Sequence, residues 1–157
     1  MNEQQHPGDT ASLRIEAPAE RCWDLVADIT QMGRLSPECT GGRWLGGAPG
    51  PSVGARFVGF NRRGWVRWFT VNTVVECERP TVFAFRTRDS GTVWSYRFEV
   101  DDDATTVTES RHAFRERPGV AAVFSKLFLG GAEGHDDEMR EGMVRTLERL
   151  KALAERP

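Results

Sequence analysis

The chain has 157 residues, of which 39% are apolar, and this is enough to close one hydrophobic core. Its formal net charge is −2 with basic residues scattered among acidic ones, which argues against the basic surface that a nucleic acid needs. No stretch approaches the roughly 20 apolar residues of a membrane-spanning helix, and the N-terminus lacks the pattern of a signal peptide. We therefore expect a cytoplasmic protein with no nucleic-acid partner and no integral membrane segment.

The N-terminal residues differ from the rest of the chain. Residues 1–10 are polar and contain a proline and a glycine, a composition typical of disorder. We therefore expect a disordered leader over residues 1–10 and a single folded domain over residues 11–157. The sequence shows no internal repeat and no low-complexity segment that would divide this domain.

The start of the domain predicts one strand and two short helices. Residues 12–17 alternate apolar and polar side chains, as in a strand with one buried face. Pro18 suits the first position of a helix, which is predicted over residues 18–28. A second short helix is predicted over residues 29–35. It should end before Ser36, because the residue that precedes Pro37 is disfavoured in helical geometry.

The middle of the chain predicts β-strands. A strand is expected around residues 42–47. From residue 55 onward, runs rich in aromatic and β-branched residues are separated by turn sequences. These runs predict strands at residues 55–63, 64–76, 81–87, 92–100 and 105–114. Together with the strands at residues 12–17 and 42–47 they make seven antiparallel strands.

After Pro118 the apolar residues adopt a helical period. They lie on one face of a predicted helix: Met139, Met143, Leu147 and Leu150. Acidic residues precede the centre of this segment and basic residues follow it, as the helix dipole favours. One long amphipathic helix is therefore predicted to end the chain, and Gly130 and Gly131 are expected to let its first half move as a lid.

This order of elements predicts an α+β protein in which a curved sheet holds the long C-terminal helix over its concave face. Seven segments carry a resemblance that spans residues 12 to 155: IEAPAERCWDLVAD, SPECTGGRWLGG, VGARFVGFNRRGWVRW, ECERPTVFAFRT, TVWSYRFEV, TTVTESR and EGMVRTLERLKALAE. In these segments the chain resembles the START-like, or SRPBCC, superfamily, in its polyketide cyclase/dehydrase and lipid-transport branch. The resemblance implies a helix-grip fold with an internal pocket for an apolar or aromatic molecule, and no particular reaction.

Aromatic residues dominate the predicted strands. Trp94, Tyr96, Phe98 and Val100 share one face of the strand at residues 92–100, and we expect this face to look toward the helix. Such rings either fill the core or line a pocket, and several Trp and Tyr residues on one concave face favour a pocket. The residues that we expect to contact a ligand are Glu38, Trp68, Phe85, Trp94, Phe128 and Met143.

The strand at residues 105–114 offers polar residues on both faces, and alternation does not decide which face lines the pocket. One set contains Glu109 and Arg111, and the other contains His112. His112 is either a general acid or base, since its charge changes near neutral pH, or a solvent-facing residue. Glu109 either faces the pocket or forms an ion pair with Arg97 or Arg111 on the outer surface. The catalytic candidates are therefore His112, Glu109 and Tyr96.

Other chemistries lack their sequence signatures. The three cysteines are isolated and in no CxxC spacing, which predicts free thiols. His135 and Glu138 form only one i,i+3 pair and the HExxH pattern is absent, so we expect no metal. The GxSxG motif and the phosphate-binding GK[ST] motif are also absent, and we expect no cofactor.

Three functions stay open. The first is binding of a small hydrophobic or aromatic ligand, lipid- or polyketide-like, between the sheet and the C-terminal helix. The second is an aromatase/cyclase or dehydratase-like enzyme that works in the same pocket without metal or nucleotide. The third is a toxin-like or co-chaperone-like protein-interaction domain, and a homodimer is also left open. Asn61, Arg62 and Arg63 at a hairpin tip are either solvated turn residues or the rim of the pocket.

Overall fold

The computed structural model describes residues 10–113 and 132–157, and for residues 132–139 it describes the backbone alone. The predicted leader therefore lies outside the described residues, except that Thr10 already begins the first strand. The elements follow one another as β1 (Thr10–Ile15), α1 (Ala19–Ala27), η1 (Ile29–Arg34), β2 (Cys39–Trp44), β3 (Arg56–Arg63), β4 (Val66–Glu78), β5 (Val82–Thr87), β6 (Thr92–Asp101), β7 (Ala104–Ala113) and α3 (Ala132–Ala154).

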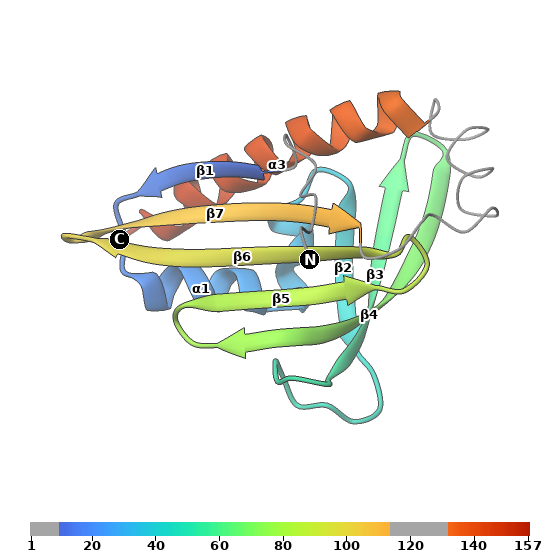
Figure 1. Ribbon diagram of the computed structural model, residues 1–157, viewed down its shortest axis with the longest axis horizontal. Helices are drawn as coiled ribbons and strands as arrows, with labels where there is room; N and C mark the ends of the chain where they lie inside the picture. The colour runs from blue at the N-terminus through green and yellow to red at the C-terminus, as the bar shows by residue number, and fades with distance from the viewer. Residues whose placement is uncertain (1–9, 114–131) are drawn as a thin grey trace, which may run out of the picture.

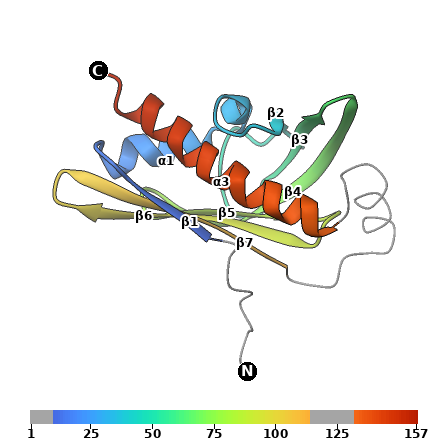
Figure 2. The same ribbon diagram turned by 90° about the horizontal axis from the view of Figure 1, so that it is seen from above.

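The strands form one seven-stranded antiparallel sheet in the order β1-β7-β6-β5-β4-β3-β2. Figure 1 shows that β2, β3 and the first part of β4 turn away from the direction of β5, β6 and β7, whereas the second part of β4 runs beside β5, so that the sheet is strongly curved. Figure 2 shows α3 lying across the concave side of this sheet, with α1 in the same layer. The predicted α+β helix-grip architecture is thus confirmed.

The first helix is held to the sheet by one large side chain. Trp23 of α1 donates its indole N–H to the carbonyl oxygen of Val82 at 2.9 Å, and its ring meets the edge of Phe83 at a centroid distance of 6.2 Å. Both aromatic side chains are buried. The hydrogen bond satisfies the polar atom of a tryptophan that is otherwise surrounded by apolar groups.

The second predicted helix exists, but it is the 3-10 helix η1 and not an α-helix. It lies so close to β2 that glycine is required at two positions. A Cβ atom at Gly33 would lie 2.3 Å from the carbonyl oxygen of Thr40, and one at Gly42 would lie 2.8 Å from that of Ile29. Neither contact is tolerable, because both partners are backbone atoms.

The main core lies where α1 and the C-terminal half of α3 cover β1 and its neighbouring strands. Its side chains are buried on the concave face or on the helices above it, and they include Ile15, Val26, Phe83, Phe98, Val107, Leu147 and Leu150. Val100 follows Phe98 on the same face, but it is 71% exposed because it lies near the end of β6.

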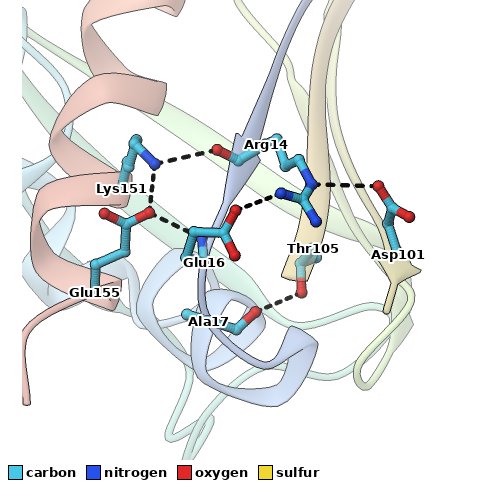
Figure 3. A network of polar contacts seen from close by, with 7 residues as sticks. All are labelled: Arg14, Glu16, Ala17, Asp101, Thr105, Lys151 and Glu155. Atoms are coloured by element: carbon cyan, nitrogen blue, oxygen red, sulfur yellow. Dashed lines mark hydrogen bonds and ion pairs between the residues drawn. The ribbon is translucent and has the colours of Figure 1, made fainter. Parts of the chain in front are cut away.

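Polar contacts fix the end of α3 against β1 (Figure 3). Glu155 accepts a hydrogen bond from the backbone N–H of Glu16 at 2.8 Å and forms an ion pair with Lys151. Lys151 also donates to the carbonyl oxygen of Arg14 at 3.4 Å. In addition, Arg21 of α1 donates to three carbonyl oxygens at the end of the chain, those of Leu153, Ala154 and Arg156. The last turn of the helix is therefore attached to both β1 and α1.

The other end of the sheet is a long hairpin between β3 and β4. The last paired residues are Arg63 and Val66, so that only Gly64 and Trp65 form the turn. Gly64 has a φ of +59°, which glycine adopts without strain. The predicted turn near Arg63-Gly64 is correct.

No α-helix among the described residues is long and apolar enough to cross a membrane.

Candidate functional site

The structure decides which face of β7 looks inward. Glu109 is 2% exposed and lies directly opposite Tyr96 of β6, which is 4% exposed. Val107 on the same face is also buried, whereas His112 on the opposite face is exposed to solvent. The concave face therefore carries Glu109, and the expectation that pairs Glu109 with an arginine on the outer surface is wrong. Arg97 does lie on that outer surface, where it faces Glu76 at 3.7 Å.

Glu109 and Tyr96 form a buried hydrogen-bonded pair. The phenol of Tyr96 donates to Oε1 of the carboxyl group at 2.8 Å. The second oxygen, Oε2, is buried and lacks a hydrogen-bond partner, and no other buried side-chain oxygen or nitrogen among the described residues shares this state. A buried polar atom without a partner is costly, so such an atom calls for a functional explanation.

Burial determines the electrostatics of this pair. Loss of hydration raises the pKa of Glu109 from 4.5 to about 8, although the hydrogen bond from Tyr96 opposes the rise. Burial, the charge of Glu109 and the hydrogen bond to it all raise the pKa of Tyr96 well above its usual value. At neutral pH the carboxyl group is therefore mostly protonated, and Tyr96 keeps its proton. A carboxyl group in this state can donate a hydrogen bond from the oxygen that Tyr96 does not contact.

Aromatic rings surround the pair along the concave face. Phe83 lies directly opposite Tyr96, and in the next row Phe85 lies opposite Trp94. Phe85 is in turn 6.1 Å from Phe83 and 5.1 Å from Phe57, measured between ring centroids. The polar pair thus lies in an apolar, aromatic setting, which is the usual composition of a small-molecule site.

One cation joins this aromatic surface. The guanidinium of Arg111 lies over the ring of Trp94 at 5.9 Å from the centroid. Arg111 shares the concave face with Glu109, since the side chains of residues two positions apart on a strand point the same way. Arg111, Trp94 and Phe85 are half-buried, whereas the row with Glu109, Tyr96 and Phe83 is buried. Glu109 therefore lies where the sealed part of the concave face gives way to a more open part.

Cys39 lies near the polar pair but has no nucleophilic character. Burial is the largest cause that raises the pKa of its thiol, and the nearby charge of Glu38 adds to the rise. The thiol donates to the carbonyl oxygen of Gly41 at 3.3 Å. A thiol that holds its proton in this way is a poor nucleophile.

The structure brings together four of the expected site residues, Tyr96, Glu109, Phe85 and Trp94. It does not bring His112 to them, because that side chain lies on the other side of the sheet. Trp68 lies on the β3–β4 hairpin and lines a separate groove of about 520 Å³.

The remaining expected site residues have different positions. Met143 is buried on α3, one turn before Leu147. Glu38 is half-buried just before β2, where its carbonyl oxygen accepts the backbone N–H of Arg62 at 2.9 Å. Phe128, like the proposed lid at Gly130 and Gly131, lies outside the described residues.

Two contributions to this surface were missed from the sequence. The sequence points to Arg111 only as an ion-pair partner, although a residue two positions from Glu109 shares its face of the strand. Asn72 and Thr87 form a buried hydrogen bond of 2.7 Å farther along the same face. Among the side chains that the structure describes, no cluster of three or more metal-ligating residues occurs.

Comparisons with known proteins agree with this architecture. The family described as polyketide cyclase / dehydrase and lipid transport matches residues 10–155. The protein BH1534 of Bacillus halodurans is 18% identical, with a TM-score of 0.67 over 95% of this chain and 97% of that chain. The Polyketide_cyc-like protein Cgl2372 of Corynebacterium glutamicum is 28% identical, with a TM-score of 0.58 over 93% and 88% of the two chains.

A larger protein contains a similar fold. The di-domain ARO/CYC StfQ from the steffimycin biosynthetic pathway is 13% identical with a TM-score of 0.68, and the likeness covers 94% of this chain and 44% of that one. No curated protein sequence matches the chain significantly. On the family match and the shared fold, the chain belongs to the polyketide cyclase/dehydrase and lipid transport family of the START-like superfamily.

Proposed function

We propose that the protein binds a small apolar or aromatic molecule, lipid- or polyketide-like, against the concave face of the sheet, with Glu109 as its polar anchor. The observation that carries this proposal is the buried Oε2 of Glu109, which has no hydrogen-bond partner although aromatic residues surround it. Leaving such an atom unsatisfied costs about 1–3 kcal/mol, and a ligand oxygen that bonds to it recovers this cost. The family description supports the same reading.

The protonation state of Glu109 defines the complementary ligand. With a pKa of about 8, the carboxyl group is mostly protonated at neutral pH and donates a hydrogen bond from Oε2. Its best partner is a carbonyl or hydroxyl oxygen of an otherwise apolar molecule. Tyr96 fixes the orientation of the carboxyl group through Oε1. Trp94 and Phe85 offer flat surfaces for an aromatic ring.

A matched pair of ligands tests this proposal. Naphthol and naphthalene differ by one hydroxyl group, and their affinities are measured by calorimetry at pH 7. The wild-type protein is expected to bind naphthol roughly tenfold more tightly, since one hydrogen bond to a buried group is worth about 1 kcal/mol or more. In Glu109→Leu this preference should vanish while naphthalene still binds.

The control variant is His112→Ala. Because His112 is exposed on the other face of the sheet, the variant should keep both affinities. Equal affinity of the two ligands for the wild-type protein would refute the role of Glu109 as anchor. Failure of both to bind up to the limit of their solubility would refute a site for fused aromatic rings.

A second function, dehydration of a β-hydroxy ketone in the same place, is favoured by one observation. A group with a pKa of about 8 exchanges its proton readily near neutral pH, as a general acid or base must. In such a dehydration the carboxylate of Glu109 removes the proton next to the ketone. The carboxyl group then returns a proton to the departing hydroxyl group, which leaves as water. Tyr96, whose pKa is raised further, positions the carboxyl group and keeps its own proton.

Absorbance of the conjugated ketone formed from a β-hydroxy phenyl ketone measures this reaction. We expect Glu109→Gln to retain binding but to lose turnover, and the rate of the wild-type protein to rise with pH through about 8. Binding of the substrate without any turnover by the wild-type protein would leave the binding function intact and overturn the enzymatic one.

A further inference from the structure

The charges of the chain are less evenly spread than the whole sequence suggests. Residues 39–75 contain five arginines and no aspartate or glutamate, although the net charge of the chain is −2. These residues form β2, β3 and most of β4. This end of the sheet is therefore rich in arginine, and Glu38 lies directly beside it, where its carbonyl oxygen accepts the backbone N–H of Arg62.

The outer end of the β3–β4 hairpin gathers basic and aromatic side chains. On its outer face Phe60 lies directly opposite Phe69, and Arg62 lies directly opposite Arg67. Trp65 occupies the turn itself. Its side chain is fully exposed at 101%, and Phe60 and Phe69 are 43% and 64% exposed. We call these five residues the basic aromatic tip. Figure 2 shows the hairpin projecting beyond the flat part of the sheet.

Folding does not explain this arrangement. Like charges directly opposite each other on paired strands are destabilising, and Arg62 and Arg67 are such a pair. Exposed aromatic rings that lie side by side form a patch of the kind that marks interaction surfaces. Trp65 contributes nothing to the core, because its side chain is surrounded by solvent. The tip therefore has the composition of a contact surface, and it lowers the stability of the isolated protein.

We propose that the basic aromatic tip docks on the surface of an anionic phospholipid bilayer. Each arginine close to such a surface strengthens binding roughly fivefold. The indole of Trp65 suits the interface between headgroups and acyl chains, where one side of the ring is apolar and the N–H stays hydrated. A bilayer also surrounds a projecting side chain, whereas the flat surface of a protein partner would cover only one side of it.

The neighbourhood of the tip fits the same occupant. A groove of about 520 Å³ lies beside it, lined by both tip arginines together with Thr40, Phe60, Asn61, Trp68 and Phe69. Arginine guanidinium groups bind phosphate well, and the aromatic lining suits the glycerol and first methylene groups of a phospholipid. Helix α3 lies in the layer on the concave side of the sheet, whereas Arg62 and Arg67 share the outer face of the hairpin with Phe60 and Phe69. The inference is independent of the ligand proposed above, although a bilayer would be a source of apolar ligands.

Flotation with vesicles tests the proposal. The purified protein is mixed with vesicles of phosphatidylcholine alone or of phosphatidylcholine with phosphatidylglycerol. We expect binding only to the mixed vesicles and loss of binding at high salt, because surface charges are screened. The variant R62E/R67E should lose at least about tenfold in affinity, since two attractive charges become repulsive.

A matched control separates the tip from net charge. The variant R145E/R149E changes two exposed arginines of α3 and alters the net charge equally. It should stay within about twofold of the wild type, while Trp65→Ala should lose a few-fold in affinity. Circular dichroism and unfolding midpoints confirm that all variants fold, as expected for exposed positions.

Three outcomes would overturn the proposal. In the first, the wild-type protein does not float with anionic vesicles, which would leave a protein partner as the better explanation of the tip. In the second, both double variants lose binding equally, which would mean that net charge alone is responsible. In the third, the protein binds neutral vesicles as tightly as anionic ones, which would remove the role of the arginines.

Discussion

Aromatic side chains are buried at one end of the sheet and exposed to solvent at the other. Where α1 and the C-terminal half of α3 cover β1 and β5–β7, aromatic residues such as Phe83 and Trp23 are buried. At the β3–β4 hairpin, Phe69 and Trp65 face solvent beside arginines. The covered end thus provides stability, and the hairpin end presents a surface for recognition. Glu109 lies between them, where the concave face passes from buried to half-buried residues.

The largest expected difference is between removing a phenylalanine ring at the covered end of the sheet and removing one at the hairpin end. Phe83→Ala deletes a fully buried ring and should lower the free energy of unfolding by about 3–5 kcal/mol. Phe69→Ala, which removes a ring that is 64% exposed, should change it by less than about 0.5 kcal/mol. Urea unfolding measures both values. Similar losses in the two variants would show that the hairpin end contributes to stability as the covered end does.

Glu109 should make the stability of the protein depend on pH. The folded state raises the pKa of this group from 4.5 to about 8, so the folded protein holds the proton more tightly than the unfolded chain. The contribution of Glu109 to stability is therefore greatest below pH 4.5, falls as the pH rises, and levels off above pH 8. The total loss is roughly 5 kcal/mol, from the size of the pKa shift.

The variant Glu109→Gln isolates this effect, because it carries no titrating proton at the same position. Unfolding by urea at pH 5 and pH 9 should show a decline for the wild type that the variant lacks. Parallel curves for the two proteins would place the pKa of Glu109 near its ordinary value. Tyr96→Phe should steepen the decline, since the hydrogen bond that lowers the pKa of Glu109 is lost.

The contact between η1 and β2 joins the covered part of the molecule to the hairpin end. Gly33→Ala would place a Cβ atom 2.3 Å from the backbone of Thr40, and relief requires η1 and β2 to move apart. We expect a loss of about 1–3 kcal/mol in stability. Gly41→Ala is the control, since a Cβ atom there meets nothing within 4 Å. Equal stability of the two variants would indicate that η1 adjusts freely.

The smallest effect concerns the end of α3. Arg21→Ala removes the donor to three carbonyl oxygens of the last turn, and we expect a loss of about 1 kcal/mol. Hydrogen exchange should quicken at the end of α3 but not at the β3–β4 hairpin. Arg149→Ala, an exposed change on the same helix, serves as the reference. Faster exchange in both regions would mean that the two ends of the sheet are coupled.

The order of the elements followed from the sequence because period and turn residues are local properties. The strands alternate over many residues, and Gly64 marks the hairpin turn. The local pattern predicted the ends of a strand less reliably, because these ends depend on pairing with the neighbouring strand. The second strand begins at Cys39, because that residue pairs with Asn61 across the sheet, and it ends before Gly46 and Gly47, which have positive φ. The predicted strand at residues 42–47 was therefore placed a few residues late.

The candidate site was predictable only in part. Alternation separated Glu109 from His112 but could not assign the inward face, because that choice depends on the pairing of Glu109 with Tyr96 on the neighbouring strand. The sequence predicts one pocket for Trp68 and Trp94, whereas Trp68 lies on the long hairpin and lines a groove that Trp94 does not line. The absence of acidic residues over residues 39–75 is visible in the sequence and would have drawn attention to the hairpin.

The fully exposed indole of Trp65 also gives the molecule a natural optical probe. Trp23 is buried and hydrogen-bonded to a carbonyl oxygen, so its emission should lie at short wavelength and resist quenching by iodide. Trp65 should emit at the long-wavelength edge and be quenched as readily as free tryptophan. Trp44, Trp68 and Trp94 are half-buried, so excitation at that red edge weights the emission toward Trp65. It therefore reports mainly the surroundings of the end of the hairpin, without any label and without disturbing the core.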